Sequence, residues 1–178
     1  MKIGLVSDTH IPEQLPELPF ELLDSLSTVD MDLHAGDLIS LEVVSALEEI
    51  AETVAVHGNV DEPEVIERLP RKQVLALEGH RIGLIHGNRP PQVELAYLKP
   101  DGSYDFPEME TFYQYLADEL PDADIIIFGH FHTPLVRRWE DRLLVNPGSV
   151  APHRGRQTFG LLDLRPSSAE VEIIDLLG

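Results

Sequence analysis

The sequence has 178 residues, of which 43% are hydrophobic and 25% charged, values that fit one globular domain spanning residues 1–178. The absence of cysteine excludes disulfides, thiolate nucleophiles and cysteine-ligated metal sites. A formal net charge of −19 would repel phosphate backbones and anionic lipids, which argues against broad nucleic-acid and membrane-surface binding.

The chain shows neither a charged leader nor a long apolar run, so we expect no signal peptide and no membrane span. We therefore expect a cytoplasmic protein.

The first predicted element is a short buried strand over residues 3–6, which stops at Ser7. Residues two apart in an extended chain point the same way, so Asp8 and His10 would present a carboxylate and an imidazole together. Open α/β sheets bind ligands at this end of their strands. A lone Asp-x-His is more typical of a cap or a turn, so the interpretation depends on further ligands.

The same pattern, an apolar strand followed by a potential ligand, recurs along the chain. Further such strands are predicted at 31–33, 54–56, 82–85 and 125–128. The side chains that follow them are Asp37, Asn59, His86, and the pair His130 and His132. Glycine next to four of the five sites would let the backbone turn sharply and bring the ligands close together.

Helical spacing of apolar residues predicts helices between these strands, at 20–26, 41–50, 63–69 and 109–120. Hairpins are predicted from 74–77 with 82–85 and from 135–139 with 143–145, and two antiparallel strands at 159–164 and 171–177 close the chain. Residues 88–107, with four prolines, predict a long loop that serves as a lid, a binding loop or a partner surface.

Seven nitrogen or oxygen donors thus follow strand ends, which is more than one four-coordinate metal needs. Two adjacent ions bridged by a carboxylate are the natural arrangement for such a set.

The ordered motifs Asp-x-His, Gly-Asp, Gly-Asn, His and Gly-His-x-His make the chain resemble the calcineurin-like metallophosphoesterase superfamily over essentially its whole length. Gly58 to Asp61 and the Asn-Pro-Gly-Ser at 146–149 are similar to the small YfcE-like phosphodiesterase branch, which is related to the Vps29 fold. The resemblance implies an α/β fold, a four-layer α/β/β/α sandwich of two mixed β-sheets flanked by helices.

The resemblance also implies roles for the donors. Asp8, His10 and His132 would hold one metal, while Asn59, His86 and His130 would hold a second, and Asp37 would bridge both. The implied cofactors are two divalent ions, usually manganese in this family, with iron, zinc, nickel or cobalt as alternatives. The implied reaction is hydrolysis of a phosphodiester by in-line attack of a metal-bridging hydroxide, with Asp37, Asn59 and His86 as the catalytic residues.

Two linked positions depart from the broader superfamily. Many members have a histidine after Gly-Asn that protonates the leaving oxygen, and an aspartate that orients it; here the residues are Val60 and Ser40. Because valine donates no proton, a poor alkoxide would leave slowly. The sequence therefore predicts activity on small phosphodiesters, clearest on activated aryl diesters, and weak hydrolysis of alkyl monoesters.

Several residues keep two interpretations. His153 and Arg154 are either an exposed surface pair or, with Asn59, contacts to the substrate phosphate. We expect His34 and His57 to be packed histidines. The alternative to an enzyme is a non-catalytic protein-interaction scaffold like Vps29, and the family also suggests a homodimer.

Overall fold

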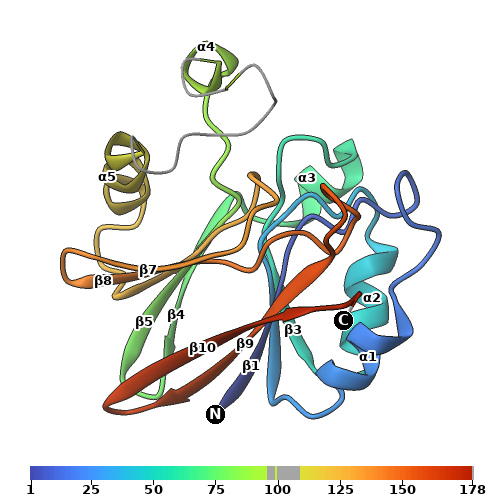
Figure 1. Cartoon of the computed structure of the whole chain (residues 1–178), viewed down its shortest axis with the longest axis horizontal. Helices are drawn as coiled ribbons and strands as arrows, with labels where there is room; N and C mark the ends of the chain where they lie inside the picture. Colours follow the sequence, from blue (N-terminus) through green and yellow to red (C-terminus); the bar gives the residue numbers. More distant parts are fainter. Residues whose placement is uncertain (96–98, 100–108, 178) are drawn as a thin grey trace.

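The fold consists of two mixed β-sheets stacked face to face with helices on the outer faces (Figure 1). The computed structural model describes residues 1–95, 99 and 109–177. The first sheet, in the order β10-β9-β1-β2-β3, contains β1 (Lys2–Val6), β2 (Met31–His34), β3 (Glu52–Ala55), β9 (Thr158–Arg165) and β10 (Ser168–Asp175). The second, in the order β4-β5-β6-β8-β7, contains β4 (Lys72–Leu77), β5 (His80–Ile85), β6 (Ile125–Ile127), β7 (Leu135–Trp139) and β8 (Arg142–Asn146).

Helices cover the outer face of each sheet. The first sheet is covered by α1 (Phe20–Leu26) and α2 (Glu42–Glu48), and α3 (Pro63–Arg68) packs into the same layer. The second is covered by α5 (Glu110–Glu119). The expected four-layer sandwich is therefore confirmed. None of the helices in the described ranges combines the length and apolar character needed to cross a membrane.

The alternation of side chains along the strands builds three apolar layers. In β6, Ile125 and Ile127 face the core between the two sheets, whereas Ile126 faces α5. In β1, Leu5 joins the core between the sheets, and Val6 joins the core under α1 and α2. Both faces of these strands are buried, which explains why they read as continuous apolar runs rather than alternating ones.

Parallel pairing places several strand ends at one edge. β1 pairs with β2 and β2 with β3 in parallel, and β5 pairs with β6 in parallel. The carboxyl ends of these five strands are followed by the candidate donors.

The predicted loop 88–107 differs in one part, because residues Pro91–Glu94 form the short helix α4. Proline at the first helical position suits a helix start, since its fixed φ is already helical and its missing N–H would have no partner there. Residues 96–98 and 100–107 of that predicted loop lie outside the described residues.

Candidate metal centre

Four of the candidate donors converge closely. One ligand atom from each member lies within 4.8 Å of the others in what we call the first donor group: Asp8, His10, Asp37 and His132. The Nε2 atoms of His10 and His132 are 3.2 Å apart, and Asp8 Oδ1 is 3.1 Å from His132 Nε2. Two imidazole nitrogens directed at each other beside a carboxylate are the donor set that a divalent transition metal binds.

The second donor group consists of Asn59, His86 and His130, and it shares Asp37 with the first. His86 Nε2 lies 3.1 Å from Asp37 Oδ2, and the rings of His86 and His130 are 5.2 Å apart between centroids. Asn59 is exposed, but its neighbour Val60 donates its backbone N–H to Asp37 Oδ1 over 3.1 Å. The loop after β3 that carries Asn59 therefore lies beside the shared carboxylate of Asp37.

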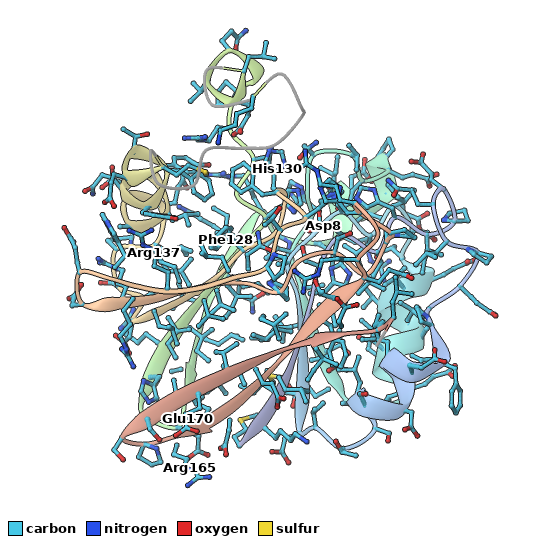
Figure 2. The ribbon with its side chains drawn as sticks, viewed as in Figure 1. Asp8, Phe128, His130, Arg137, Arg165 and Glu170 are labelled. Carbon is cyan, nitrogen blue, oxygen red and sulfur yellow. The ribbon has the colours of Figure 1, made fainter. Side chains whose placement is uncertain are left out.

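The two groups meet at the edge of the sheets that faces α4. Asp8 and His130 lie close together there (Figure 2), and the backbone N–H of His130 donates to Asp8 Oδ2 over 3.2 Å. The structure thus brings residues separated by more than a hundred positions into one cluster.

The backbone of this cluster is unusual. Five of its donors have positive φ, with values from 47° to 72°: Asp8, His10, Asp37, His130 and His132. Non-glycine residues seldom adopt this region, and each such residue costs roughly 1–3 kcal/mol unless its surroundings impose it. Such concentrated strain is typical of functional sites.

Two glycines allow the strand ends to approach each other. A Cβ at Gly129 would lie 2.7 Å from Asp8 Oδ2, and one at Gly58 would lie 2.7 Å from the backbone nitrogen of Asp37. Any side chain at either position would push the carboxylate loops apart.

The donors fit a metal because several of their buried ligand atoms face one another without forming hydrogen bonds within the described residues. Six buried side-chain atoms lack a hydrogen-bond partner in the described part of the chain, and three are Asp8 Oδ1, His86 Nε2 and His130 Nε2. Leaving buried polar atoms unpaired costs roughly 1–3 kcal/mol each. His86 donates from Nδ1 to the carbonyl of Ala35 over 2.8 Å, which leaves Nε2 as the ligand nitrogen.

The carboxylates and imidazoles of the cluster shift one another's pKa values. Burial disfavours a charged His86, but the 3.1 Å contact of its Nε2 with Asp37 and the charges of Asp8 and Asp37 outweigh it and raise the pKa of His86 to about 9. Burial alone would raise the pKa of Asp8, yet His132 and His86 hold it well below its usual value. The carboxylates are thus ionised and ready to bind cations.

Sequence reasoning missed the role of Asp61. Its carboxylate accepts the backbone N–H groups of Asp37, Ile39 and Gly58 over 3.2, 2.6 and 2.6 Å. It therefore fixes the loop after β2 against the loop after β3. The position of Asp61 at the end of the Gly-Asn-x-Asp motif was the sequence signal that could have indicated this role.

Glu94 was also missed, because it lies in the region predicted as irregular loop. Its carboxylate is 9% exposed, accepts from Arg89 and comes within 3.7 Å of His130 Nε2. Burial would raise the pKa of Glu94, but His130 and Arg89 lower it to about 2.

The remaining histidines divide as follows. His153 is half-buried, and its ring lies 5.0 Å from that of His132, so it borders the first donor group. Arg154, beside it, is exposed. His34 is buried against Thr9 and Gly36, as expected for a packed histidine, and burial lowers its pKa to about 3. His57 is half-buried beside Gly58.

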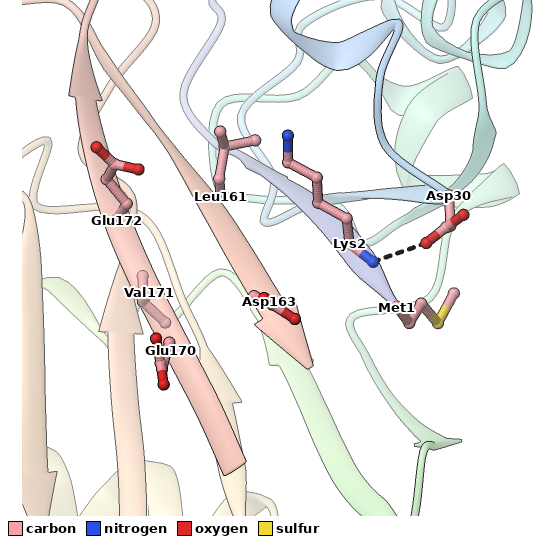
Figure 3. Close-up of a pocket in the computed structure, with 8 residues that line it drawn as sticks. All are labelled: Met1, Lys2, Asp30, Leu161, Asp163, Glu170, Val171 and Glu172. Atoms are coloured by element: carbon pink, nitrogen blue, oxygen red, sulfur yellow. Dashed lines mark hydrogen bonds between the residues drawn. The ribbon is translucent and has the colours of Figure 1, made fainter. Parts of the chain in front are cut away.

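A separate hollow of about 620 Å³ lies at the opposite end of β1 (Figure 3). It is lined by Met1, Lys2, Asp30, Leu161, Asp163, Glu170, Val171 and Glu172. None of the candidate donors borders it. The backbone N–H of Lys2 donates to the carboxylate of Asp30 over 2.7 Å. Despite its size, this hollow offers no histidine, so we do not assign it to the same chemistry.

Comparison with known proteins agrees with this geometry. Residues 1–167 match the model of the calcineurin-like phosphoesterase superfamily domain. A probable metallophosphoesterase of Methanothermobacter thermautotrophicus is 40% identical over 98% of this chain and 92% of its own length. The phosphodiesterase MJ0936 of Methanocaldococcus jannaschii is 26% identical over 92% of this chain and 93% of its own. Among solved structures, a Vps29 variant from Entamoeba histolytica superimposes with a TM-score of 0.71 at 25% identity, covering 99% of both chains.

Proposed function

Because the chain belongs to the calcineurin-like phosphoesterase superfamily, we propose that it is a metal-dependent phosphodiesterase that uses two divalent ions. The observation that carries the proposal is the position of Asp37, which clusters with Asp8, His10 and His132 and also faces His86 Nε2 over 3.1 Å. Asp8, His10 and His132 would hold the first ion, and Asn59, His86 and His130 the second. When bound, such a pair of ions supplies a water nucleophile at neutral pH and neutralises charge on the phosphate.

The chain's own residues prepare this chemistry in two ways. Asp37 divides its two oxygens, with Oδ1 accepting the N–H of Val60 and Oδ2 facing His86, so the carboxylate is fixed across both groups. His86 is buried with its Nδ1 hydrogen-bonded to Ala35, which fixes the ring and its tautomer. These two contacts would orient Asp37 and His86 towards the ions.

The substrate class follows from what the site lacks. Val60, where related enzymes place an acid, is 45% exposed and supplies no proton to a leaving group. The side chain of Ser40 accepts the N–H of Glu42 over 3.2 Å and so acts as a local turn contact. A diester with a good aryl leaving group needs no such proton. For other leaving groups, His153, whose ring borders the first donor group, is the proposed substitute acid, and Arg154 beside it is the proposed phosphate contact.

A second candidate function, a protein-interaction scaffold, is favoured by the similarity to Vps29 across nearly the whole chain. The buried ligand atoms of Asp8, His86 and His130, which form no hydrogen bond within the described residues, argue for the enzyme, because a scaffold gains nothing from donors whose crowding costs stability without a metal.

The test is a turnover assay of metal-free protein reconstituted with Mn²⁺, Zn²⁺, Fe²⁺, Ni²⁺ or Co²⁺ in turn. We expect metal-dependent hydrolysis of bis(p-nitrophenyl) phosphate and much slower hydrolysis of alkyl monophosphates. Protein treated with chelator is the control. Fast turnover of alkyl monoesters would contradict the diester preference, and no turnover with any of these metals would favour the scaffold.

Manganese as the resident ion, a single domain, a cytoplasmic location and a homodimer stay predictions. Mass spectrometry of the protein purified without added metal would identify the ion, and light scattering would give the oligomeric state.

A further inference from the structure

Glu94 is the one acidic side chain of α4, and it faces the second donor group. α4 lies above the edge of the sheets at which His130 is found (Figure 2). Glu94 Oε2 lies 3.7 Å from His130 Nε2, an atom that is buried and has no hydrogen-bond partner within the described residues. Donor atoms that bind one ion at about 2.1 Å lie roughly 3–4 Å from each other, so this separation suits two ligands of the same metal.

The two oxygens of Glu94 have different surroundings. Oε1 accepts both the backbone N–H and the Nε–H of Arg89, over 3.0 and 2.9 Å. Besides His130, the contact that Oε2 makes within the described residues is a long one of 3.5 Å with Arg89 Nη2. The Cζ atom of Arg89 lies over the ring of Phe112, 4.7 Å from its centroid, which holds the guanidinium in place beside Glu94. One oxygen is therefore held in place while the other is directed at His130.

An ion pair with Arg89 alone does not account for this geometry. A carboxylate that serves only an arginine frequently binds its planar fork with both oxygens at similar short distances. Here the second oxygen is turned towards the histidine instead. Ligating carboxylates in metal sites are commonly held by a hydrogen bond in this way.

We propose that Glu94 is an additional ligand of the second metal ion, held in position by Arg89. The inference rests on the proposed dinuclear function. It adds a charged oxygen to a group that otherwise offers one amide and two imidazoles beside the shared Asp37, and each added carboxylate strengthens binding of a divalent cation. The second ion would then be bound more tightly when α4 is seated over the sheets.

The test measures metal binding directly. Metal-free wild-type protein and the variants Glu94→Gln and Glu94→Asp are titrated with Mn²⁺ in a calorimeter, and bound manganese is counted by elemental analysis. Glu110→Gln is the matched control, because Glu110 also accepts from an arginine, Arg137 over 3.4 Å, but belongs to α5 and neither donor group.

We expect wild-type protein to bind two ions per chain. In Glu94→Gln the first step is unchanged and the second is about 10- to 100-fold weaker. Glu94→Asp keeps the charge but places the carboxylate farther from the ion. The affinity of its second binding step should therefore lie between those of wild-type protein and Glu94→Gln. The thermal unfolding midpoint of each metal-free variant shows whether it is folded.

Three results would overturn the inference. If wild-type protein binds two ions and Glu94→Gln binds each of them as tightly as wild type does, Glu94 is not a ligand, while the dinuclear proposal stands. If Glu94→Gln weakens both steps alike, the side chain acts through the fold. If wild-type protein binds fewer than two ions, the dinuclear function and the role of Glu94 fail together.

Discussion

The two donor groups differ in how the fold holds them. The first is formed by loops that directly follow β1, β2 and β6, and its carboxylates Asp8 and Asp37 are buried beside them. The second takes Asn59 from an exposed loop, and Glu94 of α4 covers His130. One half of the centre is thus fixed by the core, whereas the other depends on surface elements. The first should therefore bind its ion more tightly, and the second should be easier to alter.

The largest effect is expected where the two groups join. Asp37→Asn removes the shared carboxylate, so turnover of bis(p-nitrophenyl) phosphate should fall at least about 10³-fold, as expected when several kcal/mol of Lewis-acid stabilisation is lost. Steady-state kinetics with saturating metal measures it. Asp163→Asn, in β9, is the control. Turnover within about tenfold of wild type in Asp37→Asn would place the activity outside this centre or in a contaminant.

The two groups can be separated by single substitutions. His132→Ala should weaken the tighter Mn²⁺-binding step about 10- to 100-fold, and Asn59→Ala should weaken only the looser step by a similar factor. Calorimetric titration of the metal-free proteins resolves the two steps. Should both variants change the same step to the same extent, the division into two groups would be wrong.

A smaller effect concerns the proton on His86. With its pKa raised to about 9 in the metal-free protein, this group is protonated at pH 7.5, so binding a metal at Nε2 must release a proton. Titrations in buffers of different ionisation enthalpy should detect about one proton released at pH 7.5 and less above pH 9. Calorimetric heats that do not depend on the buffer would contradict this.

The same shift predicts the pH dependence of stability without metal. A histidine whose pKa rises on folding contributes most below its ordinary pKa of 6.5, and the contribution is lost as the pH rises through about 9. Urea unfolding of the chelated protein between pH 6 and 10 should show this decline, and His86→Gln should flatten it.

The smallest effect concerns the stability of the fold and a buried carboxylate outside the metal centre, Asp32. Asp32 in β2 is buried, neither of its oxygens has a hydrogen-bond partner among the residues described, and burial raises its pKa to about 7. An acid whose pKa rises on folding costs stability increasingly between its ordinary pKa and the raised one. Asp32→Asn should therefore be about 1–3 kcal/mol more stable than wild type at pH 8, and less so at pH 5. Equal effects of the substitution on urea unfolding at both pH values would contradict it.

The sequence predicted the strands and the donors that follow them because both depend on local patterns. Continuous apolar runs mark strands buried on both faces, as in β6, and glycines such as Gly58 and Gly129 mark close approach. The first donor group follows directly, since its members lie at the ends of such strands. Its positive φ values were beyond reach, because tertiary contacts impose them.

The parts that sequence could not supply come from the surface and from long-range contacts. Glu94 lies in a proline-rich segment with no periodicity, so its approach to His130 is visible only once α4 is placed. Asp61 binds backbone groups of a loop more than twenty residues away, which no local pattern encodes. The residues that surround and support the donors are thus the ones hardest to predict from sequence.

The central claim is that the donors at this edge hold two ions on either side of Asp37. Crystals grown with Mn²⁺ and measured at the manganese absorption edge test it most directly through anomalous difference density. We expect two peaks, one bordered by Asp8, His10 and His132 and the other by Asn59, His86 and His130. A single peak, or none between these side chains, would contradict it.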